Sequence, residues 1–165
     1  MVIMDRSEYD KKMEEHLNQS GCYKIIEKDP SNKILNKVTK KIKESSLDSF
    51  TKKKITPNSS TILRIYGAPK IHKSSIPLRP IVNTIGSPTY LLAKYLAKKL
   101  KPLSGNTSSY IKDSTSFINS IKNLEINNED LLVSFEIVSL YTMIPVDDAI
   151  NVMRKITDEE TIEFL

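Results

Sequence analysis

A single stretch of the sequence carries much of its positive charge. The 52 residues 61–112 contain nine lysines and arginines and no aspartate or glutamate. At this composition, a stretch of 52 residues without one carboxylate is not expected by chance. Residues 1–60 have a net charge of +4 and residues 113–165 a net charge of −8. We therefore expect the central stretch to face a polyanion, either nucleic acid or nucleotide phosphate. The runs Lys40–Lys41 and Lys52–Lys54 fit a solvated surface equally well.

The composition is that of an ordinary globular chain. With 165 residues, 39% of them apolar and 27% charged, the chain is long enough for one domain or for part of a larger one. Its single cysteine excludes a disulfide framework and favours a reducing compartment. No apolar run approaches the ~20 residues that span a membrane, and the first residues lack the apolar core of a signal peptide. We expect an intracellular protein, without distinguishing nucleus from cytoplasm.

Apolar spacing and helix-start signals predict several helices. The first covers 7–18, with Ser7 and Asp10 as a capping box. The second begins at Asp29–Pro30, and the serine-, lysine- and threonine-rich residues 45–60 are expected to form a loop. Later helices are expected to start near residues 87, 113 and 147. A final one should begin at a capping box of Thr157 and Glu160, and the chain is expected to be truncated soon after it.

Residues 61–83 read as a β-hairpin with a long basic tip. Residues 61–66 are β-prone, residues 67–75 have turn character, and residues 76–83 are extended. Two prolines in the second strand favour an edge or irregular strand. The hairpin places Lys70, Lys73 and Arg79 together, and His72 of the tip is a candidate phosphate contact. An arginine fork and a lysine point charge suit a triphosphate, but a rigid surface hairpin with solvated cations explains them equally well.

A strand is expected over residues 131–138, because apolar residues alternate along it. Glu136 lies in the middle of this strand. A carboxylate there is costly unless it is paired, solvated at a cleft, or bound to a metal. The sequence contains no glycine-rich phosphate loop and no cluster of cysteine and histidine.

Several ordered blocks resemble the reverse transcriptase of Penelope-like retroelements. They are YGAPKIHK at 66–73, PLRPIV at 77–82, IGSPTY at 85–90, LAKYLA at 92–97 and VSFEIVSLYTMIP at 133–145. The last resembles the family's Phe-Asp-Val-x-Ser-Leu-[Phe/Tyr]-Thr-Asn-Ile-Pro block. Residues 2–6 and 23–30 are also similar to the family's opening, so the resemblance extends over essentially the whole chain.

The resemblance implies roles for particular residues. Lys70 and Arg79, with Lys73 beside them, match the fingers positions that contact the phosphates of the incoming nucleotide. Glu136 stands where the family has the first palm aspartate, which binds both catalytic Mg²⁺ ions with help from the following carbonyl, here that of Ile137. Tyr141, five residues after Glu136, matches the steric gate that selects deoxynucleotides. The implied reaction is two-metal nucleotidyl transfer, and the implied partners are an RNA template, a DNA primer or RNA–DNA hybrid, and a dNTP.

Two features depart from the family pattern. Glutamate replaces aspartate at 136. It is still an oxygen ligand for Mg²⁺, but its extra methylene moves the carboxylate by more than about 1 Å, enough to lower the rate on the order of 100-fold. The Tyr-x-Asp-Asp turn that supplies the second carboxylate does not occur in the sequence and is expected beyond Leu165. Helix-dipole complementarity explains Asp147 and Asp148, so they are not expected to replace it.

The expected fold is therefore α+β, the front part of a right-hand polymerase. We expect an N-terminal helical region (1–60), a basic fingers region (61–112) and the truncated start of a palm (113–165). The expected function is that of a reverse transcriptase fragment of retroelement origin, inactive by itself. One alternative is a non-catalytic, basic nucleic-acid-binding relic, and another is a structural or interaction protein.

Overall fold

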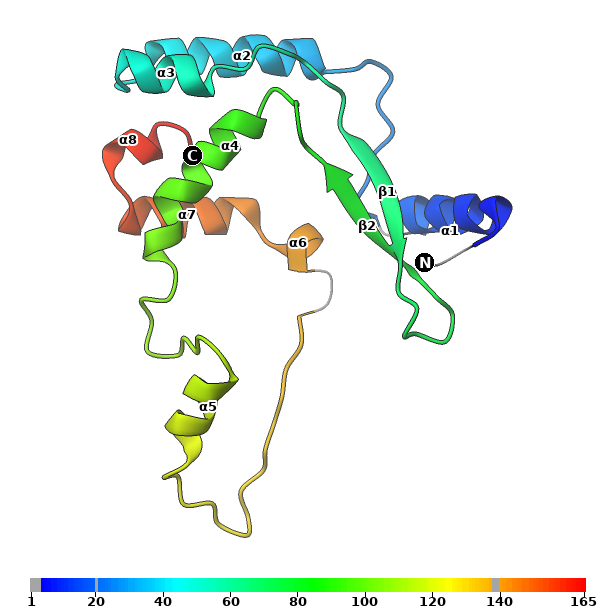
Figure 1. The fold of residues 1–165 in the computed structure, drawn as a ribbon, viewed down its shortest axis with the longest axis vertical. Helices are drawn as coiled ribbons and strands as arrows, with labels where there is room; N and C mark the ends of the chain where they lie inside the picture. The colour runs from blue at the N-terminus through cyan, green and yellow to red at the C-terminus, as the bar shows by residue number, and fades with distance from the viewer. Residues whose placement is uncertain (1–3, 20, 138–139) are drawn as a thin grey trace. The chain divides into compact units, whose positions relative to one another are not determined.

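The computed structural model describes residues 4–19, 21–137 and 140–165 and divides into two compact units, residues 1–95 and 96–165 (Figure 1). The regions 1–60, 61–112 and 113–165, which the sequence suggests from its charge, stay a prediction.

Helix α1 (Arg6–Gln19) opens the first unit. Its N-terminus is capped by Asp5, whose carboxylate accepts hydrogen bonds from the Ser7 backbone N–H at 2.8 Å and from the Ser7 hydroxyl at 2.6 Å. The predicted capping box of Ser7 and Asp10 is therefore wrong by two residues. Asp10 instead lies 3.7 Å from the Arg6 guanidinium, in an exposed ion pair.

The β-hairpin predicted from the sequence is present. Strand β1 (Arg64–Pro69) pairs antiparallel with β2 (Leu78–Asn83), in a register that sets Gly67 opposite Pro80 and Ala68 opposite Arg79. Helix α1 packs against this sheet (Figure 1). Met13 of α1 and Leu78 of β2 are buried. Pro80 is tolerated because Gly67 and Pro80 form a non-hydrogen-bonded pair of the ladder, in which neither residue has to donate to the opposite strand. The backbone N–H of Gly67 accordingly donates to the Tyr9 hydroxyl at 2.6 Å.

Helices α2 (Ser31–Glu44) and α3 (Ser49–Ile55) form a helical hairpin. Its apolar residues Ile42, Leu47 and Ile55 are buried. The loop expected over 45–60 is thus partly wrong, because α3 occupies its middle. Asp48 caps α3 by accepting from the backbone N–H groups of Phe50 and Thr51 at 2.9 and 3.0 Å. The hydrogen bonds from Thr51 lower the pKa of Asp48 below its ordinary value.

The segments before and after the hairpin are hydrogen-bonded to each other. The backbone N–H of Thr61 and the hydroxyl of Ser59 both donate to the carbonyl of Gly86, at 3.2 and 3.1 Å. Gly86 has a φ of +77°, which glycine adopts without the steric cost paid by other residues. Helix α4 (Tyr90–Leu100) follows, and the boundary between the two units falls within it. The 3₁₀ helix η1 (Lys101–Leu103), which contains Pro102, comes directly after α4.

The second unit contains four further helices among its described residues: α5 (Ser114–Ile121), α6 (Leu140–Met143), α7 (Val146–Ile156) and α8 (Glu159–Ile162). Asp113 caps α5, in agreement with the helix start expected near residue 113. Asp158 caps α8 through the backbone N–H of Thr161 at 2.7 Å, so the predicted capping box of Thr157 and Glu160 is wrong. Asp147 and Asp148 lie in the first turn of α7, as expected.

The strand expected over residues 131–138 is not observed. Residues 131–137 have no regular secondary structure and are exposed, and residue 138 lies outside the described part of the chain. The alternating pattern is present in the sequence, but within the described part of the chain these residues have no partner strand to which their backbone groups could bond. In the described residues, no helix is both long and apolar enough to cross a membrane.

Candidate nucleotide-binding hairpin

The hairpin has one face packed on α1 and one face directed away from it. A Cβ placed on Gly67 would lie 2.7 Å from the Met13 sulfur, so the side-chain direction at Gly67 points toward α1. Side chains alternate along a strand, and residues directly opposite each other share a face. Ala68 and its partner Arg79 therefore belong to the face directed away from α1.

Lys70 belongs to the same face as Arg79. Its backbone N–H donates to the Pro77 carbonyl at 2.9 Å, which continues the ladder for one step beyond the assigned strands. Lys70 is then diagonal to Arg79, a relation that places Cα atoms roughly 7–8 Å apart. Arg79 is exposed and Lys70 is partly exposed. The structure thus brings together the two cations that the sequence analysis singled out.

The tip of the hairpin is a compact turn. The backbone N–H of Lys73 donates to the Lys70 carbonyl, and that of Ile76 donates to the Lys73 carbonyl, both at 3.0 Å. Ile76 has a φ of +44°, a left-handed conformation that is strained for a β-branched residue. Lys73 and His72 are both exposed in this turn. Lys73, the third predicted cation, is therefore at the tip, three residues after Lys70 and hydrogen-bonded to it through the backbone.

Helix α1 holds this tip through Lys12, a residue that the sequence analysis did not identify. The Lys12 ammonium donates to the carbonyls of Ser75 and Ile76 at 2.9 and 3.2 Å, and it lies 2.8 Å from the Glu8 carboxylate. An ammonium has three N–H donors, so these contacts can use all of them. Nothing in the local sequence indicates this contact, because its partners are backbone carbonyls more than 60 residues away.

Two further residues share the face of Lys70 and Arg79. Arg64 and Tyr66 alternate with Ile65 and Gly67 on β1, and the side chain of Tyr66 is 50% exposed. The alternation of two residues per repeat would have indicated both once β1 was assigned. The face therefore presents three cations and one aromatic ring across the two strands of the hairpin.

The hairpin cations are not neutralised by carboxylates. In the described part of the chain, the ion pairs involve Arg6, Lys12, Lys40 and Lys99, and none involves Lys70, Lys73 or Arg79. Lys99 is the exception within the basic stretch 61–112, since its ammonium lies 2.8 Å from Glu160 and 3.9 Å from Asp158. Part of the positive charge of this stretch is thus matched by acidic residues of the second unit, where Lys99 also lies.

The predicted palm residues lie in the second unit. Glu136 and Ile137 belong to the exposed segment without regular structure, and Tyr141 is in α6 with 94% of its surface exposed. The described residues contain no group of three or more His, Cys, Asp or Glu able to hold a metal ion. Glu136 and the Ile137 carbonyl alone are too few oxygen ligands for a dedicated magnesium site, so they do not by themselves fit the two-ion arrangement.

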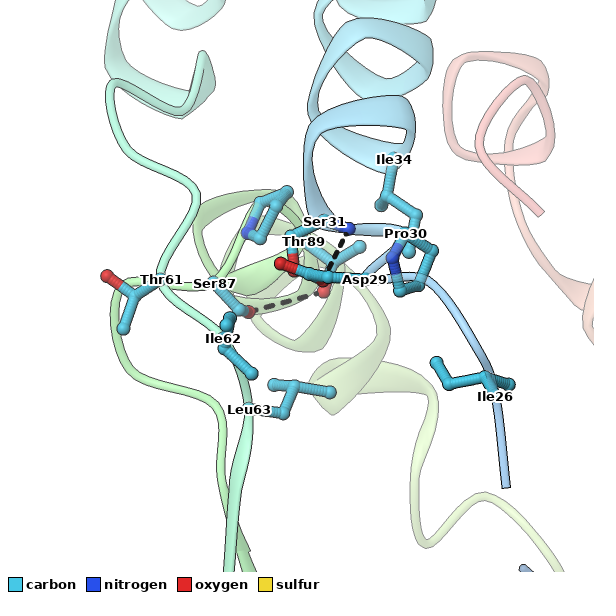
Figure 2. Close-up of a pocket in the computed structure, with 11 residues that line it drawn as sticks. Ile26, Asp29, Pro30, Ser31, Ile34, Thr61, Ile62, Leu63, Ser87 and Thr89 are labelled. Carbon is cyan, nitrogen blue, oxygen red and sulfur yellow. Dashed lines mark hydrogen bonds between the residues drawn. The ribbon is translucent and has the colours of Figure 1, made fainter. Parts of the chain in front are cut away.

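A pocket of about 440 Å³ lies elsewhere in the first unit. It is lined by the start of α2, by residues 61–63 and by residues 87–89 (Figure 2). Its one ionisable group, Asp29, accepts from the backbone N–H and hydroxyl of Ser31 at 2.9 and 2.6 Å, and these bonds lower the pKa of Asp29. No lysine or arginine lines this pocket, and a site with a single carboxylate does not suit phosphate.

Comparison with known proteins finds no family model, no curated protein and no solved structure that matches this chain.

Proposed function

We propose that this chain binds a nucleoside triphosphate with its β-hairpin, as the front portion of a reverse transcriptase similar to those of Penelope-like retroelements. The observation that carries the proposal is the placement of Lys70 and Arg79 on the exposed face of the hairpin, opposite the face packed on α1. An arginine fork can bind two phosphate oxygens at once, while the neighbouring lysine adds a point charge. The sequence blocks around both residues support the same assignment.

In this proposal the residues have separate tasks. Arg79 and Lys70 bind the phosphates, and Lys73 at the tip adds a third charge. In the second unit, Glu136 and the Ile137 carbonyl are proposed by resemblance as contacts to Mg²⁺, which these two groups alone are too few to hold. The resemblance assigns Tyr141 of the same unit to the sugar of a nucleotide. Because the sequence does not contain the Tyr-x-Asp-Asp block that supplies the second carboxylate, we do not expect this chain to polymerise DNA by itself.

Triphosphate binding by charge-matched variants tests the proposal. The Kd of a fluorescent dNTP with Mg²⁺ is measured for the wild-type chain, for Arg79→Gln and for Arg64→Gln. Arg64 shares the face of Arg79 but lies four residues from Ala68, about 13 Å along the strand. We expect Arg79→Gln to weaken binding about tenfold or more, as for loss of a charged hydrogen-bonded pair, and Arg64→Gln to change it less than about twofold. Equal effects of the two variants, or no binding by the wild type, would reject the proposal.

The exposed cations of the hairpin, with Arg64 and Tyr66 on the same face, also fit a second candidate, a non-catalytic nucleic-acid-binding relic. Such a protein would bind an RNA–DNA hybrid in a salt-dependent manner and would not bind a free dNTP. The two candidates are therefore separated by the same titration, repeated with a hybrid in place of the triphosphate.

A further inference from the structure

Helix α2 carries a row of lysines that the hairpin does not explain. Between Asp29 and Glu44 the chain has five lysines and no acidic residue. Lys33, Lys37 and Lys40 are spaced by four and three residues, which places them on one face of the helix over about 10 Å of its axis. All three are exposed, whereas Ile42 on the opposite side of the helix is buried.

These lysines do not help the helix to form. Lys33 lies in the first turn of α2, where the helix dipole disfavours a cation, and no acidic residue is present in that turn. Lys33 and Lys37, four residues apart, repel each other, as do Lys37 and Lys41. By contrast, Lys41 and Lys43 in the last turn complement the dipole. The row of Lys33, Lys37 and Lys40 therefore costs local stability, which a role in binding an anion would explain.

Few carboxylates of the helical hairpin are available to neutralise the row. Glu44 lies 3.8 Å from Lys40 in a widely exposed pair, which contributes little in water. Asp48 is engaged in capping α3. Neither Lys33 nor Lys37 takes part in an ion pair within the described residues. Lys33, Lys37 and Lys40 thus present largely unpaired positive charge on one face of helix α2.

We infer that the α2 row of Lys33, Lys37 and Lys40 binds the phosphate backbone of a nucleic-acid duplex. Helix α2 contains no aromatic residue on which unpaired bases could stack, and the lysines of the row are suited to phosphate contacts. A linear row of cations on a helix fits the regular line of phosphates on a duplex. The inference rests on the proposed function only in that a reverse transcriptase also binds a nucleic-acid duplex, and it uses a surface outside the basic stretch 61–112.

The dependence of binding on salt tests this inference. Binding of a short RNA–DNA hybrid to the full chain is followed by fluorescence anisotropy between about 50 and 200 mM salt. The triple variant Lys33→Gln, Lys37→Gln, Lys40→Gln removes three charges with little change in helix propensity. We expect the slope of log K against log salt to fall in magnitude by about 2 to 3, because each phosphate contact on a duplex contributes about 0.9.

A second triple variant is the matched control. Lys11→Gln, Lys122→Gln, Lys155→Gln removes the same charge at exposed positions on other elements and should change the slope by less than about 1. The thermal midpoint of the α2 variant should equal or exceed that of the wild type, because repulsion within the helix is removed. An equal loss of slope in both variants, or an unchanged slope in the α2 variant, would overturn the inference. A loss of self-association with an unchanged slope would overturn it too, since the row would then bind a second copy.

The outcomes also separate this inference from the proposed function. If Arg79→Gln weakens dNTP binding while the α2 variant leaves the hybrid slope unchanged, the inference is wrong and the triphosphate proposal stands. If the slope falls as expected and no dNTP is bound, the α2 surface is supported and the triphosphate proposal is rejected.

Discussion

Gly67 is the residue at which the first unit has no room for a side chain. A Cβ there would lie 2.8 and 2.9 Å from Cδ1 and Cβ of Leu78, in addition to its approach to Met13. The Met13 side chain can turn aside, but the Leu78 Cβ is fixed by its backbone. We therefore expect Gly67→Ala to lower the free energy of unfolding by about 1 to 3 kcal/mol, measured by urea denaturation.

Ser74→Ala is a suitable control for this substitution. Ser74 is exposed in the tip of the same hairpin, so its replacement should leave the free energy of unfolding unchanged within about 0.5 kcal/mol. Equal stability of Gly67→Ala and the wild type would contradict the packing of α1 against the sheet.

The position of Gly67 shows a limit of local sequence signals. The sequence suggests a turn beginning at this glycine, whereas the structure places it inside β1. Glycine is favoured in turns, but it is also required where another element approaches a strand closely. Only the packing of α1 distinguishes the two, and that packing joins residues more than 50 positions apart.

At the scale of elements, the contact between α1 and the hairpin tip should be measurable. Lys12→Met removes the hydrogen bonds to the carbonyls of Ser75 and Ile76. A hydrogen bond to a charged group is worth about 1.5 to 3 kcal/mol, so we expect amide exchange in residues 70–77 to accelerate about tenfold or more. Hydrogen exchange followed by mass spectrometry provides the measurement.

Lys11→Met provides the comparison for this variant. Lys11 is exposed and adjacent in sequence, and the same change of charge there should leave exchange at the tip unaltered. If both variants accelerate exchange equally, the effect comes from the charge of α1 and not from the contact of Lys12.

Elements with local signals could be predicted, and those that depend on distant partners could not. The hairpin, α1, α2 and α7 follow from apolar spacing, prolines and acidic helix starts. Helix α3 was missed because its serine, threonine and lysine residues resemble a loop, although Asp48 was an available N-cap signal. The strand over 131–138 was predicted from alternation alone, which cannot supply the neighbouring strand that a sheet needs.

In the candidate site, too, some residues could be predicted from local sequence signals and others depend on distant partners. Lys70, Lys73 and Arg79 could be selected from the sequence because the prolines and glycine around them indicate a hairpin. Their common face depends on the register, which sets Ala68 opposite Arg79. The contribution of Lys12 could not be predicted, since it arises only when α1 packs against the sheet.

At the scale of the whole molecule, the buried apolar residues are concentrated in the first unit. Met13, Ile42, Leu47, Ile55 and Leu78 are the buried hydrophobic residues of the described chain, and all precede residue 96. Local stability follows the density of buried apolar contacts. We therefore expect slow amide exchange in α1, α2 and the hairpin, and fast exchange across residues 122–137.

Hydrogen exchange of the full chain, resolved by peptide, measures this difference. The expected contrast is at least about tenfold in exchange rate between the two sets of peptides. Uniform protection of both units would show that residues 122–137 are held by contacts other than the buried apolar residues named here.

The exposed segment 131–137 also has a consequence for how the protein behaves at high concentration. Leu131, Leu132 and Phe135 have 87%, 99% and 92% of their surfaces exposed. A short β-prone stretch of this kind favours intermolecular aggregation into cross-β assemblies. Glu136 is the one charged residue of the segment 131–137, and a charge within such a stretch opposes self-assembly. The carboxylate proposed here as a magnesium ligand would thus also keep the protein dispersed.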